Sequence, residues 1–204
     1  MADSSTKIKT TVMRKLKWLS TLPENTCRAQ LAELRRGVGH APGDIPALWG
    51  MIFSDLPEEY YSKNGEPTAA EWAIYLALTM FACHQQGHDF KSNWMHGDEI
   101  RFGMAVRKLA PAADDTDEDL KRIRNRFHRI ATASDMGELA NHMRSMVKLL
   151  SANNVAMDYA DLAVDLYRYY FPNARASVRL KWGQDFCRTF ENIADENQQD
   201  RKDN

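Results

Sequence analysis

The sequence of 204 residues predicts an all-α fold, a helical bundle of about eight or nine helices in two packed halves. Three observations support this class. Apolar residues recur at helical spacing along most of the chain, and no run of β-branched residues, which would be typical of strands, interrupts them. Gly and Pro divide the periodic segments into pieces of ordinary helix length. The hydrophobic share of 44% is sufficient for one large core, so two independent domains are not required.

The first predicted helix is basic and amphipathic, and it ends before Pro23. Its apolar residues, spaced by about one helical turn, are Ile8, Val12, Leu16 and Leu19. This apolar face is too narrow for a membrane anchor, so we expect the helix to dock on the body of the protein. A second helix is predicted to run to Arg36, with Thr26 as its N-cap and Gly37 as a left-handed stop.

The middle of the chain contains the clearest core helix. It begins after Thr68, which forms a capping-box pattern with Glu71, and it ends at Gly87. One face of this helix carries Trp72, Tyr75, Leu76, Thr79, Met80 and Cys83. Shorter helices are predicted on either side of it, over residues 45–53, where a Pro stands near the start, and over residues 100–109.

Between Leu120 and Leu150 a basic helix is predicted to turn back on a second amphipathic helix, which Ser134 caps. The apolar arc of the basic helix consists of Leu120, Ile123, Phe127 and Ile130. Beside this arc lies a stripe of guanidinium groups from Arg122, Arg126 and Arg129. Such groups, spaced by about one helical turn, suit a row of phosphates. Most charged helix faces are only solvated surface, and the stripe alone does not decide between these two interpretations.

The C-terminal region contains a predicted helix over residues 158–171 and then an ambiguous segment over residues 177–192. In that segment Val178, Leu180 and Trp182 alternate with basic residues, as in a strand. We predict a helix, because no partner strand exists elsewhere and a helical i, i+4, i+8 row is also present. The row consists of Val178, Trp182, Phe186 and Phe190.

An acidic loop around residues 111–117 is the predicted boundary inside the chain. Residues 1–110 are expected to form an N-terminal helical half, and residues 118–192 a C-terminal helical bundle. Residues 193–204 are polar and are expected to form a flexible acidic tail.

Three cysteines, Cys27, Cys83 and Cys187, lie far apart within apolar patterns. We expect them to be buried, reduced thiols of a cytoplasmic protein. No apolar stretch is long enough to span a bilayer, and the N-terminus lacks the apolar core of a secretory signal. We therefore expect no membrane association.

Motifs of catalytic chemistry are missing: no Gly-rich phosphate loop, nucleophile elbow, paired-cysteine site or HExxH helix is present. The candidate metal ligands are Cys83, His84, His88 and His96. Their convergence is not expected, because Cys83 and His84 are adjacent on a helix and point about 100° apart. Asp161 and Asp165 could hold a divalent ion or form a solvated helix face. The sequence thus predicts no enzyme, no metal and no cofactor.

Basic residues gather in clusters although the formal net charge is only -1. The clusters are Arg35 and Arg36; Arg101, Arg107 and Lys108; the stripe from Arg122 to Arg129; Arg144 and Lys148; and Arg175, Arg179 and Lys181. Arg exceeds Lys in them, which favours bidentate contact with phosphates. No recognition helix and no aromatic platform is evident, so we expect binding to the backbone of a nucleic acid without base readout.

Several segments in a fixed order carry a family resemblance. They are LAELRRGVGHAPGDIPALW from Leu31, EWAIYLALTMFACHQQG from Glu71, RFHRIATASDMGELANHMRSMVKLL from Arg126, MDYADLAVDLYRYYF from Met157, and VRLKWGQDF ending at Phe186. With these segments the sequence resembles the small subunit of the type I-E CRISPR surveillance complex, the CasB family of Cascade. The resemblance covers most of the chain except the first twenty or so residues and the tail.

The resemblance implies an all-helical, non-enzymatic subunit that is present in two copies beside other Cascade subunits. It would contact guide RNA and target DNA through basic surface and help to hold the displaced strand. The positions that match the family are Arg35, Arg36, Arg107, Lys108, Arg126, Arg129, Arg144, Arg179 and Lys181. Where the family often has a basic residue after Gly103, this chain has Met104, and Arg101 is the expected substitute. The alternative of a different class is a helical protein–protein adaptor without direct nucleic-acid contact.

Overall fold

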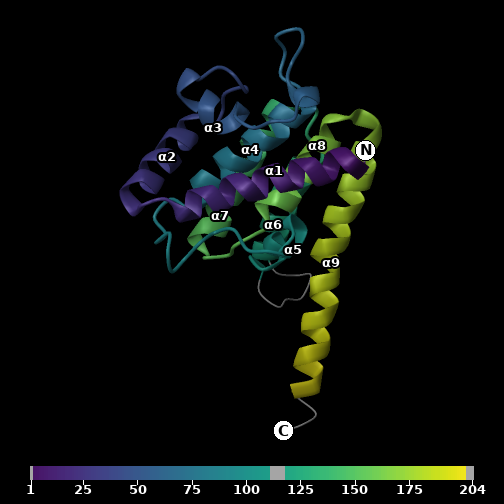
Figure 1. Cartoon of the computed structure of the whole chain (residues 1–204). Coiled ribbons are helices and arrows are strands. Elements are labelled where there is room, and N and C mark those ends of the chain that lie inside the picture. Colours follow the sequence, from purple (N-terminus) through teal and green to yellow (C-terminus); the bar gives the residue numbers. More distant parts are fainter. Residues whose placement is uncertain (1, 111–117, 201–204) are drawn as a thin grey trace.

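The computed structural model describes residues 2–110 and 118–200, and within these ranges it confirms the predicted all-α class. The α-helices of this part are α1 (Ala2–Thr21), α2 (Glu24–Arg36), α3 (Trp49–Phe53), α4 (Ala69–His84), α5 (Phe102–Arg107), α6 (Glu118–Ala131), α7 (Met136–Ala152), α8 (Tyr159–Tyr170) and α9 (Arg175–Asp200). Short 3-10 helices are η1 (Pro46–Leu48), η2 (Glu58–Tyr60) and η3 (Pro172–Ala174). Figure 1 shows these helices packed around α4, with α1 lying across the outside.

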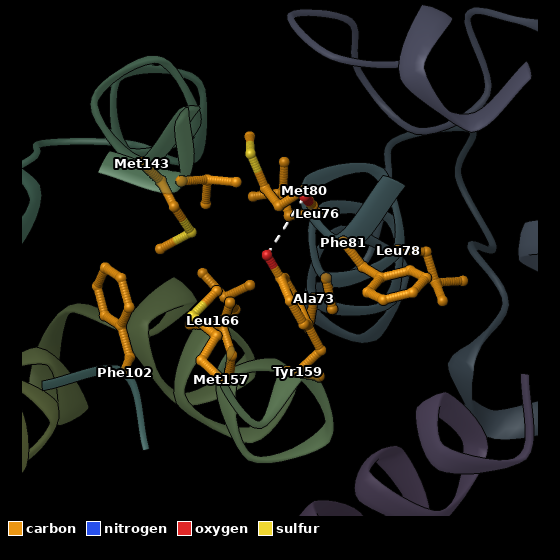
Figure 2. Close-up of a cluster of buried hydrophobic side chains, with 14 of the residues drawn as sticks. Ala73, Leu76, Leu78, Met80, Phe81, Phe102, Met143, Met157, Tyr159 and Leu166 are labelled. Carbon is orange, nitrogen blue, oxygen red and sulfur yellow. Dashed lines mark hydrogen bonds between the residues drawn. The ribbon is translucent and has the colours of Figure 1, made fainter. Parts of the chain in front are cut away.

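Helix α4 forms the centre of the core, because it is apolar on every side rather than on one stripe. It packs against α1, α2, α7 and α8. Figure 2 shows Met143 of α7 and Tyr159 and Leu166 of α8 facing the side chains of α4. The hydroxyl of Tyr159 donates a hydrogen bond to the carbonyl of Met80 at 3.3 Å. The predicted capping box of Thr68 and Glu71 at the start of α4 is present.

The two expected halves share one hydrophobic core. Helix α4 of the first half packs on α7 and α8 of the second, and α1 packs on α8. Helix α5 likewise packs on α9. The expected boundary at residues 111–117 lies outside the described residues. Helix α1 docks on the body as predicted, because Ile8, Val12, Leu16 and Leu19 are all buried.

Three predicted helix ends are wrong. Helix α2 starts at Glu24 with Pro23 as the N-cap, so Thr26 lies inside the first turn. Asp135 rather than Ser134 caps α7, because the Asp135 carboxylate accepts the N–H of Glu138 at 2.8 Å. Gly37, the predicted left-handed stop after α2, is not left-handed either. This glycine has a different role.

Gly37 has a right-handed conformation, with φ -67 and ψ -17. A Cβ at this position would lie 2.7 Å from the Tyr75 hydroxyl and 2.8 Å from side-chain atoms of Leu48 and Thr79. The absence of a side chain therefore lets the end of α2 approach α4 closely. The Tyr75 hydroxyl also donates a hydrogen bond to the Gly37 carbonyl at 2.7 Å.

The ambiguous C-terminal segment is a helix, as predicted, and belongs to α9. The backbone of residues 193–200, which are part of the expected tail, continues this helix, and residues 201–204 lie outside the described part. Figure 1 shows the C-terminal part of α9 extending beyond the other helices.

An aromatic cluster joins α5, α6, α8 and α9. The ring of Phe102 lies 5.6 Å from that of Phe127 and 5.3 Å from that of Trp182. Tyr169 stacks on Trp182 at 5.8 Å, and Phe186 lies 5.6 Å from Phe127. Edge-on and stacked aromatic pairs of this kind each add about 1 kcal/mol beyond the burial of their area. The cluster holds α6 against the rest of the bundle.

The three cysteine thiols are free, but their burial differs. Cys27 is buried, Cys83 is half-buried and Cys187 is exposed, so the prediction of three buried thiols is wrong for Cys187. No helix among the described residues is both long enough and apolar enough to cross a membrane.

The contact between α5 and α9 gives a first prediction. A Cβ on Gly103 would overlap the backbone carbonyl oxygen of Trp182 and lie 2.8 Å from the Cβ of Asp185. Because neither atom belongs to a flexible side-chain end, Gly103→Ala should lower the free energy of unfolding by about 1–3 kcal/mol in urea titration. The control Gly183→Ala adds a methyl group to α9 with no atom within 4 Å. It should raise the free energy of unfolding by up to about 1 kcal/mol. Equal effects of the two substitutions would contradict this packing.

Candidate nucleic-acid interface

The predicted arginine stripe of α6 lies on the surface. Arg122, Arg126 and Arg129 are exposed, while Phe127 of the same helix is buried in the aromatic cluster. Arg122 pairs with Asp119 at 3.1 Å. Both side chains of that pair are more than two-thirds exposed, so the pair contributes little stability and can be exchanged for another anion.

A second group of cations converges from helices far apart in the sequence. Arg35 on α2 and Arg144 and Lys148 on α7 all act electrostatically on the thiol of Cys83 in α4. Burial raises the pKa of this thiol, and the three positive charges oppose the shift. Arg35 is also held in place, because its guanidinium donates a hydrogen bond to the carbonyl of Ala82 at 3.4 Å. Arg144 and Lys148 are exposed.

Arg28 extends this group along α2. It lines, together with Arg35 and His88, a cavity of about 510 Å³ between α2 and the chain after α4. Gly87 turns the chain there with φ +86, a conformation that favours glycine. The carboxylate of Asp89 also lines the cavity, where hydrogen bonds from Ser92 lower its pKa. We call Arg28, Arg35, Arg144 and Lys148 the α2–α7 basic cluster.

Arg28 was not among the predicted site residues. Its position seven residues before Arg35 places both on one face of α2, and this spacing was the signal that could have identified it. Of the other predicted cations, Arg36 and Lys108 are exposed. Arg36 forms an exposed ion pair with Glu33 at 3.3 Å.

Lys181 is a structural residue in this chain. Its ammonium group donates to Asp161 at 2.7 Å and to Asp165 at 2.8 Å. Trp182 Nε1 donates to the second oxygen of Asp165 at 2.7 Å. Burial alone would lower the pKa of Lys181, but the two carboxylates outweigh it and raise the pKa. The ammonium group of Lys181 is therefore occupied by two ion pairs, and the two carboxylates bind this ammonium group instead of forming a solvated helix face.

Arg107 is likewise removed from the surface. Its side chain is 1% exposed, its guanidinium donates to the carbonyl of Ala110 at 3.2 Å, and it lies 6.0 Å from the ring centroid of Phe186. A guanidinium enclosed in this way by α5 and α9 cannot meet a phosphate without rearrangement of the core. The prediction that Arg107 contacts nucleic acid therefore gains no support from this conformation.

Arg179 and Arg101 hold helices together. Arg179 Nε donates to the carbonyl of Ala131 at the end of α6, where a positive charge complements the helix dipole. The Arg175 guanidinium donates to the carbonyl of Ser134, in the connection between α6 and α7. Arg101 pairs at 2.7 Å with Asp185, whose side chain is almost fully buried. These contacts account for the three arginines without a nucleic acid.

The candidate metal ligands bind other groups. The Nδ1 atom of His84 lies 2.9 Å from the Tyr159 hydroxyl, and His88 Nε2 lies 3.0 Å from the Ser151 hydroxyl. His96 Nδ1 accepts the backbone N–H of Tyr159 at 3.2 Å. Burial lowers the pKa of His84 to about 4, which keeps it neutral in the core. In the described part of the chain, no three His, Cys, Asp or Glu side chains form a group that could hold a metal ion.

The assignment of Lys181 gives a second prediction. Lys181→Met leaves the buried carboxylate of Asp165 without its cation, so the free energy of unfolding should fall by about 3 kcal/mol at neutral pH. Lys148→Met removes an exposed cation of the α2–α7 basic cluster and should change the free energy of unfolding by about 0.5 kcal/mol or less. Urea titration of both variants measures this difference. A stable Lys181→Met variant that loses nucleic-acid affinity would restore Lys181 as a binding residue.

Comparison with known proteins places the chain in a family. The family model of the CRISPR-associated protein Cse2 matches residues 30–186. Among solved structures, CasB from Thermobifida fusca is 30% identical, with a TM-score of 0.71, and the match covers 88% of this chain and 97% of that one. A Cse2-family protein from Thermus thermophilus shares the fold, with 22% identity, a TM-score of 0.61 and coverage of 87% and 96%. A search of curated protein sequences gives no significant match. The chain therefore belongs to the Cse2 family of CRISPR-associated proteins and is a subunit of a CRISPR system.

Proposed function

We propose that this chain is a non-catalytic subunit of a type I-E Cascade complex that binds the backbone of the guide RNA and target DNA and stabilises the opened target and its displaced strand. Two copies act beside the other Cascade subunits. The observation that supports this function best is the α2–α7 basic cluster, in which cations from α2 and α7 act on the same side chain, Cys83 of α4.

Backbone binding is the mode that the chemistry of the cluster favours. Three of its members act on the Cys83 thiol, and Arg28 and Arg35 border an open cavity. Guanidinium groups bind phosphate oxygens in pairs, and no sequence information is read in this way. In RNA-guided complexes base pairing with the guide reads the sequence, so a protein subunit needs only to recognise shape and charge.

The α6 stripe provides a second backbone contact. Arg122 and Arg129 are seven residues apart, which is about 10 Å along the helix axis. A strand of duplex presents a phosphate about every 3.4 Å along its axis, so the stripe spans about three phosphates. Phe127 fixes the orientation of this face, because it is packed between Phe102 and Phe186.

The alternative function, a helical adaptor that contacts only proteins, is favoured by one observation. At the start of α6 the cations already have local partners, Glu118 with Lys121 and Asp119 with Arg122. Part of the positive charge of the helix is therefore compensated within it. The adaptor and the nucleic-acid subunit differ in how they respond to salt and to charge reversal.

The third prediction concerns salt. If about four phosphates are neutralised, the logarithm of the affinity for a single strand should fall against the logarithm of the salt concentration with a slope of about -3. Affinity should vary little among unrelated sequences of equal length. Fluorescence anisotropy of the purified chain measures both quantities, and the labelled strand should remain at full length after incubation with Mg²⁺. A flat salt response, a hundredfold sequence preference or cleavage that a chelator stops would each contradict the proposal.

The fourth prediction separates binding from folding by charge reversal. In one variant Arg144 and Lys148 become Glu, and in another the three arginines of the α6 stripe become Glu. Because all five side chains are exposed, each substitution should change the free energy of unfolding by about 0.5 kcal/mol or less. Each lost phosphate contact should reduce the salt slope by about 1.

The control for charge reversal is Lys63→Glu, an exposed lysine in the loop before α4, which should leave the slope unchanged. Thermal unfolding, assembly of the complex and retention of target DNA are measured for all variants. Full retention of target DNA by both reversed variants would exclude these two surfaces and leave the adaptor as the better function. If only the variant with Arg144→Glu and Lys148→Glu loses target DNA, the α6 stripe does not belong to the interface.

A further inference from the structure

Helix α1 presents an unusual outward face. Residues 4–21 contain no Asp or Glu. The side chains that α1 leaves exposed or partly exposed along this face are Lys9, Thr10, Met13, Arg14, Lys17 and Trp18. The whole helix precedes residues 30–186, the segment that matches the Cse2 family model. Figure 1 shows α1 on the outside of the bundle.

A cavity of about 630 Å³ lies beside the C-terminal half of α1. Arg14, Lys15 and Trp18 line it from α1, Gln30 lines it from α2, and small or flexible residues of η1 and α3 line the other side. Those residues are Ala47, Gly50, Met51, Ser54 and Asp55. A Cβ on Gly50 would meet no atom within 4 Å, so this wall leaves room for a flat group against the Trp18 ring.

Next to this cavity, Lys9, Thr10, Met13, Arg14 and Lys17 border an open, basic hollow on the surface of α1. Arg14 borders both, and we call the cavity and this hollow together the α1 trough. From Lys9 to Trp18 the trough is about 14 Å long. Cations line its length, and the indole of Trp18 lies at one end.

The walls of the α1 trough are held by hydrogen bonds to the end of α3. Lys15 Nζ donates to the carbonyls of Met51 and Ser54 at 2.8 and 2.9 Å. Burial lowers the pKa of Lys15 to about 8. The Arg14 guanidinium donates to the carbonyl of Asp55 at 2.9 Å, and Asp55 has φ +58. These bonds fix α1 against α3, so the cavity is formed before any ligand arrives.

Trp18 is 46% exposed, which leaves a large aromatic ring in contact with water beside cations. Trp49 has a similar exposure, 51%, but it does not line the α1 trough, and its Nε1 donates to the carbonyl of Gly43 at 2.9 Å. An exposed ring next to a positively charged groove is the arrangement by which proteins bind single-stranded nucleic acids, because the ring stacks on a base and the cations follow the backbone.

We propose that the α1 trough binds a segment of single-stranded nucleic acid, with one unpaired base stacked on Trp18 in the cavity between α1 and α3 and the neighbouring phosphates on Arg14 and Lys17. The choice of nucleic acid as the ligand rests on the proposed function. The inference adds a base contact to a subunit that is otherwise expected to touch only the backbone. A duplex does not fit this geometry, because its bases expose only their edges. Gln30, Ser54 and the carboxylate of Asp55 offer polar groups to the base edge inside the cavity.

The experiment compares two strands on the full chain. One is oligothymidylate about twelve nucleotides long, within the range of known single-strand sites, and the other is an abasic strand of equal length and charge. Removal of the bases should weaken binding to the natural chain about tenfold, the effect of one lost stacking contact. Trp18→Ala should bind both strands equally, at the abasic level. Trp18→Phe should retain most of the preference, and the control Trp49→Ala should retain all of it.

The variants also separate this inference from the proposed function. The double variant Arg144→Glu, Lys148→Glu should bind both strands more weakly yet still prefer the strand with bases, because its α1 trough is intact. Equal binding of both strands by the natural chain, or a base preference that survives in a folded Trp18→Ala variant, overturns the inference and leaves the proposed function standing. Binding of neither strand overturns both. Polyglutamate is tested as an acidic polypeptide. If the natural chain binds it and the Trp18→Ala variant binds it more weakly, the inference is overturned in favour of a protein partner.

Discussion

The structure depends on the burial of α4 from all sides. A helix that is apolar around its whole circumference must be covered all round, and α1, α2, α7 and α8 provide the cover. Each covering helix turns its apolar stripe inward, so its polar face is directed outward at a position fixed by the core. The α2–α7 basic cluster and the α1 trough both lie on such faces. Hydrophobic packing therefore positions both surfaces, and the hydrogen bonds of Lys15 and Arg35 hold these side chains in place within them.

The cations of this chain divide into two populations by the cost of desolvation. An ammonium or guanidinium group loses hydration when it is buried, and it remains in the interior only with a compensating partner. Lys181 has Asp161 and Asp165, and Lys15 has the carbonyls of Met51 and Ser54. Those groups stabilise contacts between helices. Exposed cations such as Arg144 and Lys148 keep their hydration and remain available for phosphates.

Much of the fold followed from the sequence, because helical periodicity and capping are local signals. The capping box at Thr68, the inward face of α1 and the arginine stripe of α6 were predicted from residues within a few turns of one another. The helical state of α9 was also predicted, although its length was not. The end of α2 was misjudged because Gly37 serves a tertiary contact with Tyr75, and a glycine required for such a contact has no local signature.

The candidate site was less predictable, because it is defined by contacts between distant helices. No local pattern indicated that Lys181 would meet two carboxylates of α8, or that Arg107 would be enclosed beside Phe186. Nor did any pattern show that Arg35 and Arg144 would both act on Cys83. A basic residue on a helix has the same local appearance in the interior of a bundle and on its surface. Tertiary packing alone separates the two cases.

We propose that nucleic acid, not a protein partner, covers the α2–α7 basic cluster. Chemical footprinting of the assembled complex tests it most directly, with phenylglyoxal for Arg144 and an acetylating reagent for Lys148, before and after target DNA is added to complexes with and without guide RNA. We expect both residues to react in the assembled protein subunits and to become protected when guide and target are bound, while Lys63 reacts throughout. Protection already complete in the protein subunits alone, or full reactivity in the target-bound complex, would contradict it.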